Sequence, residues 1–457
     1  MPKPSISRQL SKWAAEVPPM NNPDALSIAR DAFADTIACM FGGLTNEGVQ
    51  KLIQINSSWD ASGTNVVFGT QRRFNTPTAA LINGAAAHAL DFDDNYIPAF
   101  THASAVMVPA LLAIGGQNSL SGKSLLDAYI VGAELHTRIG LLVNPGHFNQ
   151  GWHSTATVGT IGTAGACARL LGLDETGICT AMSIGFSLAA GSKKQFGTMM
   201  KPIHAGLAAQ HAVMAAGMAS VGISANLDFL TGPFSFQDHY ATTDLSRESR
   251  VLKGLGSGLC LSKYGLLVKR FPCCGSAHKS LDGFLHLREK HQTAPENIKQ
   301  ATTWLPETMS RNLPFDHPKN EMEGRFSLHY NAARILLEGS LSLRHFTKEA
   351  VFDPEILGFL SRICRETIPD PEDINPTTPL LNRIELVDGR VFEYEVEHLK
   401  GSLQIPLSPA DIKNKFEDCV RFAGIDDFPE ELYAKCAGLD DDENIKPLMD
   451  QVSRLMP

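Results

Sequence analysis

The stretch STATVGTIGTAGACARLLG, residues 154–172, decides the fold of this chain. Gly159, Gly162 and Gly165 recur every three residues, so one face of a helix formed here carries almost no side chain. Each glycine in a helix costs about 0.5–1 kcal/mol relative to alanine, but the bare face lets a second helix approach closely. Because the remaining residues, apart from Arg169, are small or apolar, the stretch predicts a central helix of a large helical domain, not a surface helix.

Similar segments extend outward from this helix, and the helical pattern runs from about residue 23 to 265. They include LSIARDAFADTIACMFGG (26–43), AALINGAAAHALD (79–91) and PIHAGLAAQHAVMAAGMASVG (202–222). Near Lys269 prolines become more frequent, and LNRIELVDGRVFEYEVEH (381–398) alternates apolar and polar residues around Asp388-Gly389, which predicts a β-hairpin. We therefore expect a mainly α fold, with a large all-helical domain (1–268 with 403–457) and a smaller α+β domain (269–402).

The composition indicates a large core and limits the classes of partner. Of 457 residues, 43% are hydrophobic and 19% are charged, below the roughly 25% that is usual. A net charge of −9 argues against nucleic-acid binding but leaves an anionic substrate open. The first twenty residues lack a secretion signal, and there is no apolar run that could cross a membrane. The nine cysteines form no CxxC pair, as expected for reduced thiols in a cytoplasmic protein.

Titratable residues gather in HALDFDDNYIPAFTHAS, residues 88–104, directly beside an alanine-rich run. On a continued helix, Asp91, Asp94 and Asn95 would share one face, at positions i, i+3 and i+4. One interpretation is a solvated helix end, with Asp94 and Asn95 capping the next turn. The other is a functional cluster, because buried charge without a partner is costly. The spacing matches no zinc or calcium template, so no metal is expected.

Further polar residues stand at the predicted starts of helices. GWHSTATVG places His153 just before the glycine-faced helix, and KPIHAG places Lys201 and His204 in the first turn of another. Helix N-termini attract anions, and a lysine adds to that field. KRFPCCGSAH (269–278) and GRFSLHY (324–330) add further basic, thiol and phenol groups. Each residue alone is more often structural. Together they predict a cleft between domains, lined by residues that suit proton transfer on an anionic substrate.

Nucleotide, flavin and hydrolase signatures are missing from the sequence. There is no GxGxxG after a strand, no P-loop, no HExxH and no GxSxG, so no cofactor is expected.

In that order, HALDFDD, the THxS segment, GWHSTATVGTIGTAG, KPIHAGLAAQHAV, KRFPCCGSAH and GRFSLHY resemble the MmgE/PrpD family across essentially the whole chain. This family includes 2-methylcitrate dehydratase, cis-aconitate decarboxylase and iminodisuccinate epimerase. The resemblance implies a large helical domain, a smaller α+β lid domain, a cofactor-free site between them and a homodimer. It also implies these site residues: Asp91, Asn95, His102, His153, Lys201, Lys269 and Tyr330.

Two departures from the family pattern bear on the reaction. Cys274 stands where the decarboxylase branch has a histidine, and THASA replaces the THPSD-like segment of the dehydratase branch. By elimination, we expect an epimerase that inverts a carbon α to a carboxylate in a small amino- or imino-dicarboxylate resembling iminodisuccinate. A lyase, either a 2-methylcitrate-type dehydratase or a cis-aconitate-type decarboxylase, is the alternative. A non-catalytic helical scaffold is the alternative from another class.

The epimerase hypothesis gives each site residue a role. Removal of a proton α to a carboxylate needs a base, and cations must stabilise the negative charge that develops. His102 and His153 are expected to transfer the proton, Asp91 to orient one of them, and Tyr330 to be a second acid. The expected substrate-binding residues are Lys201, Lys269, Asn95 and Cys274.

Overall fold

The computed structural model describes residues 4–241, 247–370 and 378–455, which form two compact units. The first unit comprises Met1–Ala89, Asp93–Leu266 and Lys413–Pro457, and the second comprises Leu90–Phe92 and Leu267–Ile412. Helices dominate and one small mixed sheet is present, so the predicted mainly α fold class is confirmed. The predicted domain boundaries stay a prediction, because clustering of contacts does not test whether either part folds alone.

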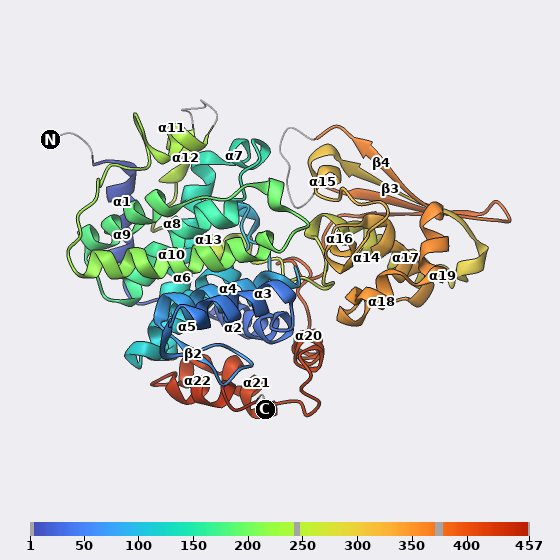
Figure 1. The fold of residues 1–457 in the computed structure, drawn as a ribbon. Coiled ribbons are helices and arrows are strands. Elements are labelled where there is room, and N and C mark those ends of the chain that lie inside the picture. The colour runs from blue at the N-terminus through green and yellow to red at the C-terminus, as the bar shows by residue number, and fades with distance from the viewer. Residues whose placement is uncertain (1–3, 242–246, 371–377, 456–457) are drawn as a thin grey trace. The chain divides into compact units, whose positions relative to one another are not determined.

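The first unit is helical apart from one short strand pair (Figure 1). Its helices are α1 (Ile6–Glu16), α2 (Pro23–Gly43), α3 (Glu47–Ser58), α4 (Thr76–Ala89), η1 (Ile97–Ala99), α5 (Ala103–Asn118), α6 (Gly122–Val143), α7 (Gly146–Asn149), α8 (Ser154–Leu170), α9 (Glu175–Leu188), η2 (Lys193–Gln195), α10 (Met200–Ser220), α11 (Phe236–Tyr240), α12 (Glu248–Val251), α13 (Cys260–Tyr264), α21 (Glu430–Ala437), η8 (Leu439–Asp441) and α22 (Lys446–Val452). β1 (Ser62–Val66) pairs antiparallel with β2 (Arg73–Phe74). The residues of α20 (Pro409–Phe422) are divided between the two units.

The second unit is an α+β structure around a four-stranded sheet of order β4-β3-β5-β6. Its strands are β3 (Ile298–Pro306), β4 (Ile363–Ile368), β5 (Leu380–Leu386) and β6 (Val391–Val396). Its helices are η4 (Gly275–Ala277), α14 (His278–His291), η5 (Pro295–Asn297), α15 (Glu307–Arg311), α16 (Glu321–Arg325), α17 (Leu328–Glu338), η6 (Leu343–Phe346), α18 (Lys348–Val351), α19 (Pro354–Phe359) and η7 (Leu360–Arg362). β3 runs parallel to β4, and β5 runs antiparallel to both β3 and β6.

The predicted β-hairpin is confirmed. β5 and β6 pair antiparallel, and Gly389 between them has φ +87°, a conformation that glycine adopts without a steric penalty. The Asp388 side chain accepts a hydrogen bond from the Arg390 backbone N–H at 3.0 Å, which fixes the turn. Leu281 and Phe284 of α14 share a buried core with Ile384 of β5, so the helix covers the sheet.

Close approach along the glycine-faced helix is confirmed at two of its three glycines. A Cβ at Gly162 would lie 2.3 Å from His136 Cδ2, and one at Gly165 would lie 2.4 Å from Leu135 Cδ1, both on α6. At Gly159 the nearest atom would be Val106 Cγ2 at 3.5 Å, an ordinary contact. Helices α4, α5, α8 and α10 also pack against one another, and together they place the polar residues described below.

The crossing of α4 and α10 depends on Gly206. A Cβ there would lie 2.2 Å from the Leu81 carbonyl oxygen and 2.9 Å from the Ala85 nitrogen, both backbone atoms. Gly206→Ala is therefore expected to lower the free energy of unfolding by about 1–3 kcal/mol through overpacking. Gly217→Ala on the same helix is the matched control, because nothing lies within 4 Å of its added Cβ. Urea denaturation should show a neutral or stabilising change for the control, and an equal loss in both variants would contradict this account.

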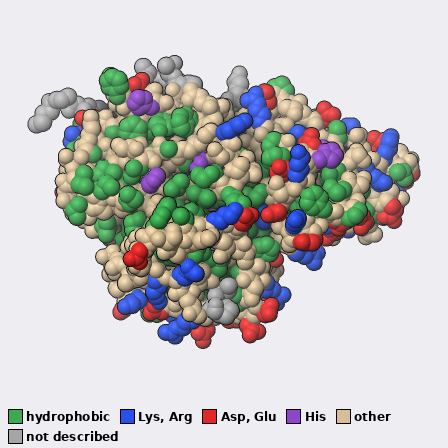
Figure 2. Space-filling view, in the orientation of Figure 1, with side chains coloured by type: hydrophobic (Ala, Val, Ile, Leu, Met, Phe, Trp, Pro, Cys, Tyr) green, Lys and Arg blue, Asp and Glu red, His purple; other side chains and the backbone are tan. Residues whose placement is uncertain are grey.

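The face of the first unit that Figure 2 shows is unevenly charged. Figure 2 shows hydrophobic side chains and little charge around α9 and α10, whereas charged side chains gather around α21 and α22. Exposed apolar residues near the end of α10 include Val221 and Ile223. Among the described residues, no helix combines the length and apolar character needed to span a bilayer.

Candidate functional site

The aspartates of the DFDD segment lie in a loop. α4 ends at Ala89 and Asp91 has φ +51°, so the prediction that Asp91, Asp94 and Asn95 share a helical face is wrong. The solvated-end interpretation is also wrong, because Asp91, Asp93 and Asp94 are only 3%, 0% and 1% exposed. Each aspartate has a different set of tertiary partners, which holds the chain away from the helical path.

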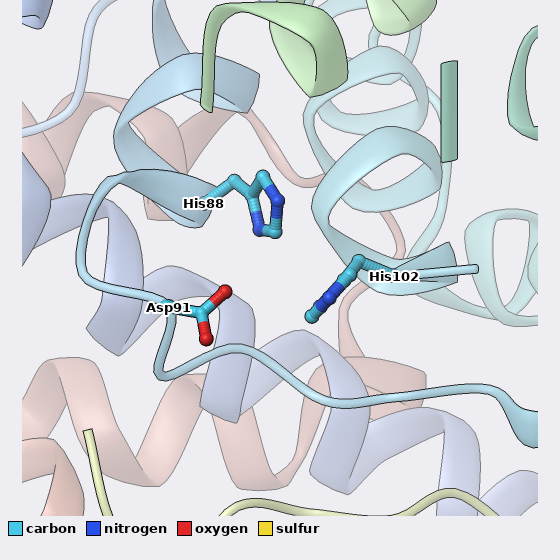
Figure 3. Close-up of side chains that lie close together, drawn as sticks. All are labelled: His88, Asp91 and His102. Carbon is cyan, nitrogen blue, oxygen red and sulfur yellow. The ribbon is translucent and has the colours of Figure 1, made fainter. Parts of the chain in front are cut away.

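In the first unit, Asp93 lies between two imidazoles. His88, at the end of α4, has Nδ1 2.9 Å from Asp93 Oδ2, and His102, just before α5, has Nδ1 3.0 Å from the same oxygen. The centroids of the two rings are 4.3 Å apart. Figure 3 shows the rings side by side, with Asp91 on the turn that follows His88. One carboxylate oxygen therefore lies within 3.0 Å of both imidazoles.

The electrostatics of this cluster keep Asp93 ionised and His88 neutral. Burial acts to raise the pKa of Asp93, but His88 and His102 hold that pKa well below its usual value. Burial lowers the pKa of His88 to about 3, even though the Asp93 charge opposes this shift. At neutral pH the cluster thus presents a carboxylate and an uncharged imidazole.

Three helix N-termini meet beside these histidines. His102 precedes α5, and its backbone N–H donates to Thr155 Oγ1 in the first turn of α8 at 3.0 Å. His153 precedes α8, and its Nδ1 lies 3.2 Å from Nδ1 of His204 in the first turns of α10. The starts of α5, α8 and α10 are therefore neighbours, and their dipoles favour negative charge at this point.

Lys201 adds a full positive charge at the start of α10. It is 3% exposed, and its Nζ lies 5.5 Å from the centroid of the Phe196 ring, which also contacts His153 edge-on. Burial lowers the pKa of His153 well below its usual value, and the neighbouring His88 and Lys201 lower it further. Burial, followed by Lys201, also lowers the pKa of His204. A cation beside neutral imidazoles suits an anionic ligand that needs proton transfer.

Asp94 belongs to a separate buried network. Ser104 Oγ donates to Asp94 Oδ2 and lies 2.6 Å from the Tyr129 hydroxyl oxygen. Burial raises the pKa of Asp94 to about 7, and the Ser104 hydrogen bond only partly offsets this shift. Asp94 is therefore protonated in much of the folded protein at neutral pH, unlike Asp93 beside it.

The Asp94 carboxyl should make stability pH-dependent. Its pKa is about 7 when folded and about 3.9 when unfolded, so the folded state retains this proton between pH 4 and 7. Stability should therefore fall as pH rises through that window, by roughly 4 kcal/mol in total, and level off above it. Asp94→Asn removes this pH dependence. The free energy of unfolding of the variant, relative to that of the unchanged protein, should therefore increase from pH 4 to 8. Denaturation at several pH values checks this, and a constant difference would contradict it.

In the second unit, Lys269 holds Asp91. Lys269 is fully buried, with Nζ 3.0 Å from Asp91 Oδ2 and 2.6 Å from the Asp91 carbonyl oxygen. Arg325, also buried, donates from Nη1 to the Leu90 and Pro272 carbonyl oxygens, both at 2.8 Å. Burial lowers the pKa of Arg325 to about 10, although Asp91 opposes that shift. These two cations fix the Leu90–Phe92 segment.

Comparison with known proteins now decides the family. The model of the MmgE/PrpD N-terminal domain matches residues 8–248, and that of the MmgE/PrpD C-terminal domain matches residues 271–427. The chain belongs to the MmgE/PrpD family. A cis-aconitate decarboxylase of Mus musculus is 30% identical over 405 residues, and one of Homo sapiens over 398, each covering 84% of this chain and 80% of the relative. A cis-aconitate decarboxylase-like protein of Aspergillus oryzae is 25% identical over 441 residues, covering 91% of this chain and 90% of the relative.

The structure brings together three residues that the MmgE/PrpD resemblance implied. His102 and His153 both contact His88, and Lys201 lies beside His153 in the same unit. Asp91 and Lys269 form their own ion pair in the second unit. Asn95 and Cys274 are partly exposed, and the Cys274 backbone N–H donates to the Arg325 carbonyl oxygen at 2.9 Å. The functional roles of all these residues stay predictions.

Tyr330 is engaged in the core of the second unit. Its hydroxyl donates to the His345 carbonyl oxygen and accepts from Arg334 Nε at 3.2 Å. Burial raises the pKa of Tyr330, which opposes release of its proton. Its predicted role as a second acid stays a prediction.

Sequence reasoning omitted three residues from the site of this MmgE/PrpD protein. His88 and Asp93 were visible in HALDFDD, and His204 in KPIHAG, but neither motif showed their partners. The missing signal was tertiary, because Asp93 reaches a histidine nine residues later and His204 reaches His153 fifty-one residues earlier.

Figure 3 shows a group of three side chains of types that bind transition metals, namely His88, Asp91 and His102. The Lys269 ammonium already lies 3.0 Å from the Asp91 carboxylate and would repel a cation there. The donor set therefore does not favour a metal.

Proposed function

We propose that this protein is a cofactor-independent lyase acting on a small polycarboxylate, with decarboxylation of cis-aconitate or a close analogue as its leading reaction. The similarity to two cis-aconitate decarboxylases, 30% identical over 84% of this chain, carries the proposal. It outweighs the elimination that favoured epimerisation, because that argument rested on two short departures, at Cys274 and at THASA. The relatives therefore support the reaction that the sequence analysis kept as an alternative.

The charge of the site supports a substrate with several carboxylates. Lys201 is buried where the N-termini of α5, α8 and α10 meet, so it can bind one carboxylate while the helix starts bind another. These groups are fixed before the substrate binds, and such prearranged charge stabilises negative charge that develops during a reaction.

The reaction needs stabilisation of an electron pair and delivery of one proton. cis-Aconitate carries one carboxylate on a CH₂ group next to its double bond. When that C–C bond breaks, CO₂ leaves and the bonding pair forms a new terminal C=C bond. The pair of the original double bond moves to the carbon α to another carboxylate, where a proton completes an unsaturated dicarboxylate. One substrate and one proton thus give one CO₂ and one product.

His102 is the best candidate to supply that proton. Its side chain is 14% exposed and lies 3.0 Å from the Asp93 carboxylate, which stabilises a protonated imidazole. His153 is buried with a pKa well below its usual value, so it is neutral before substrate binds. Negative charge on a bound substrate would favour protonation of either ring.

Epimerisation is the second candidate, and the neutral histidines favour it. Burial keeps His88 and His153 unprotonated near neutral pH, as required of a base that removes a proton α to a carboxylate. The scaffold alternative is disfavoured, because a scaffold gains nothing from a buried cluster that costs desolvation energy. The homodimer and the cytoplasmic location stay predictions.

Proton NMR in D₂O, with metal-free protein, distinguishes these reactions. The substrates would be cis-aconitate, citrate, 2-methylcitrate and stereodefined iminodisuccinate. New vinyl signals with CO₂ release from cis-aconitate would support decarboxylation, whereas vinyl signals without CO₂ from a hydroxy acid would indicate a dehydratase. Loss of an α-proton signal with inversion and no vinyl signal would replace the proposal by epimerisation. No change with any compound would contradict the substrate class.

A further inference from the structure

His88 contains an unexplained polar atom. Its side chain is fully buried and its Nδ1 contacts Asp93, but its Nε2 has no hydrogen-bond partner among the described residues. A buried polar atom without a partner is costly, so such atoms usually contact a ligand, a water or a reacting group. His88 Nε2 is therefore a buried polar atom whose hydrogen-bonding capacity the described residues leave unused.

We propose that Asp93 is the positioning residue of the site, and that it locks both His88 and His102 in the tautomer with the proton on Nδ1. An ionised carboxylate can only accept hydrogen bonds, and it repels the lone pair of an unprotonated nitrogen at 3 Å, so each Nδ1 beside it is expected to carry the proton. Each Nε2 is then left with a lone pair or, once protonated, with an acidic N–H. Asp93 thus makes Nε2 the atom of both rings that can take up or release a proton, and Asp93 does not contact the substrate itself.

Three observations carry this inference. Both Nδ1 atoms lie within 3.0 Å of one carboxylate oxygen, with hydrogen-bond geometry for His88 and at ion-pair distance for His102. Asp93 is completely buried, so water does not compete for its lone pairs. His88 Nε2 has no hydrogen-bond partner among the described residues, so this buried ring nitrogen is available to a polar group that binds there. The inference rests on the proposed function only for the effect on turnover, because the tautomers exist in the free protein.

Long-range ¹H–¹⁵N NMR of protein labelled with ¹⁵N-histidine reads the tautomers directly. His88→Gln and His102→Gln assign the two rings by the signals that disappear. In the unchanged protein, both rings are expected to carry the proton on Nδ1. Asp93→Asn replaces one acceptor oxygen by a donor NH₂, so at least one ring should move its proton to Nε2.

The matched control is Asp94→Asn, which makes the same change one residue later in a network that lacks both histidines. Asp93→Asn should lower kcat about 10²- to 10⁴-fold with KM changed less than about fivefold, as for loss of an orienting carboxylate. Asp94→Asn should retain kcat and both tautomers. A kcat for Asp93→Asn within threefold of the unchanged protein would overturn the proposal. A neutral His88 or His102 ring with its proton on Nε2 instead of Nδ1 in the unchanged protein would also overturn it.

The tautomer result separates this inference from the proposed function. If no compound of the panel reacts, the function fails while the spectra still decide the role of Asp93. If Asp93→Asn does not fold, the spectrum of the unchanged protein decides it alone.

Discussion

Replacement of His102 by glutamine is expected to lower kcat about 10²- to 10⁴-fold while the protein stays folded. The size of this effect is that of a general acid or base in other enzymes. Glutamine matches the length of the imidazole and can still donate toward Asp93, but it cannot transfer a proton. Because the His102 side chain is only 14% exposed, the similar size of glutamine is what keeps the disturbance of packing small. Steady-state kinetics with the substrate found in the NMR panel measure the loss of kcat. Circular dichroism shows whether the variant stays folded.

His211→Gln provides the matched control for that variant. His211 lies on α10 in the same unit, is only partly buried, and has no part in the site described above. Its replacement should leave kcat and KM within about twofold. Equal losses in the two variants would show that the effect arises from the fold, and full activity of His102→Gln would remove His102 from the mechanism.

Replacement of Lys269 by methionine is expected to destabilise the second unit by about 3–5 kcal/mol. The change leaves Asp91 as a buried carboxylate without its ammonium partner, which is the costly way to break a buried ion pair. Lys299→Met is the control, because Lys299 forms an ion pair with Glu385 that is 61% exposed on the lysine side. An exposed pair of that kind should contribute less than about 1 kcal/mol.

A double-mutant cycle isolates the Asp91–Lys269 interaction. Asp91→Asn combined with Lys269→Met should cost less than the sum of the two single changes, because no uncompensated charge remains. Urea denaturation of the four proteins gives the coupling free energy. Additive effects would show that the buried pair contributes nothing specific to stability.

Much of the fold was predictable from periodic patterns. Small residues and glycines in 154–172 predicted a helix approached closely by another, and Gly162 and Gly165 contact α6 as that pattern requires. Asp388-Gly389 predicted the hairpin because the turn is local. The path of the DFDD loop was not predictable, since Asp91 takes a left-handed conformation that depends on Lys269, a residue 178 positions away.

The types of residue in the site were predictable from the sequence, but the contacts between them were not. His102, His153 and Lys201 stood in distinct motifs, and the helix starts that they occupy were visible in the sequence. Three acidic residues in DFDD looked equivalent, yet Asp91 pairs with Lys269, Asp93 with two histidines and Asp94 with Ser104. Burial and long-range contacts give each a different charge state, which no local pattern encodes.

The most direct test of the proposed decarboxylase is CO₂ release from cis-aconitate labelled with ¹³C in its carboxyl groups. The account predicts one labelled CO₂ for each substrate consumed, appearance of an unsaturated dicarboxylate in equal amount, and loss of both in His102→Gln. Exchange of an α-proton in a stereodefined dicarboxylate with inversion, and no CO₂ from cis-aconitate, would contradict it and establish an epimerase instead.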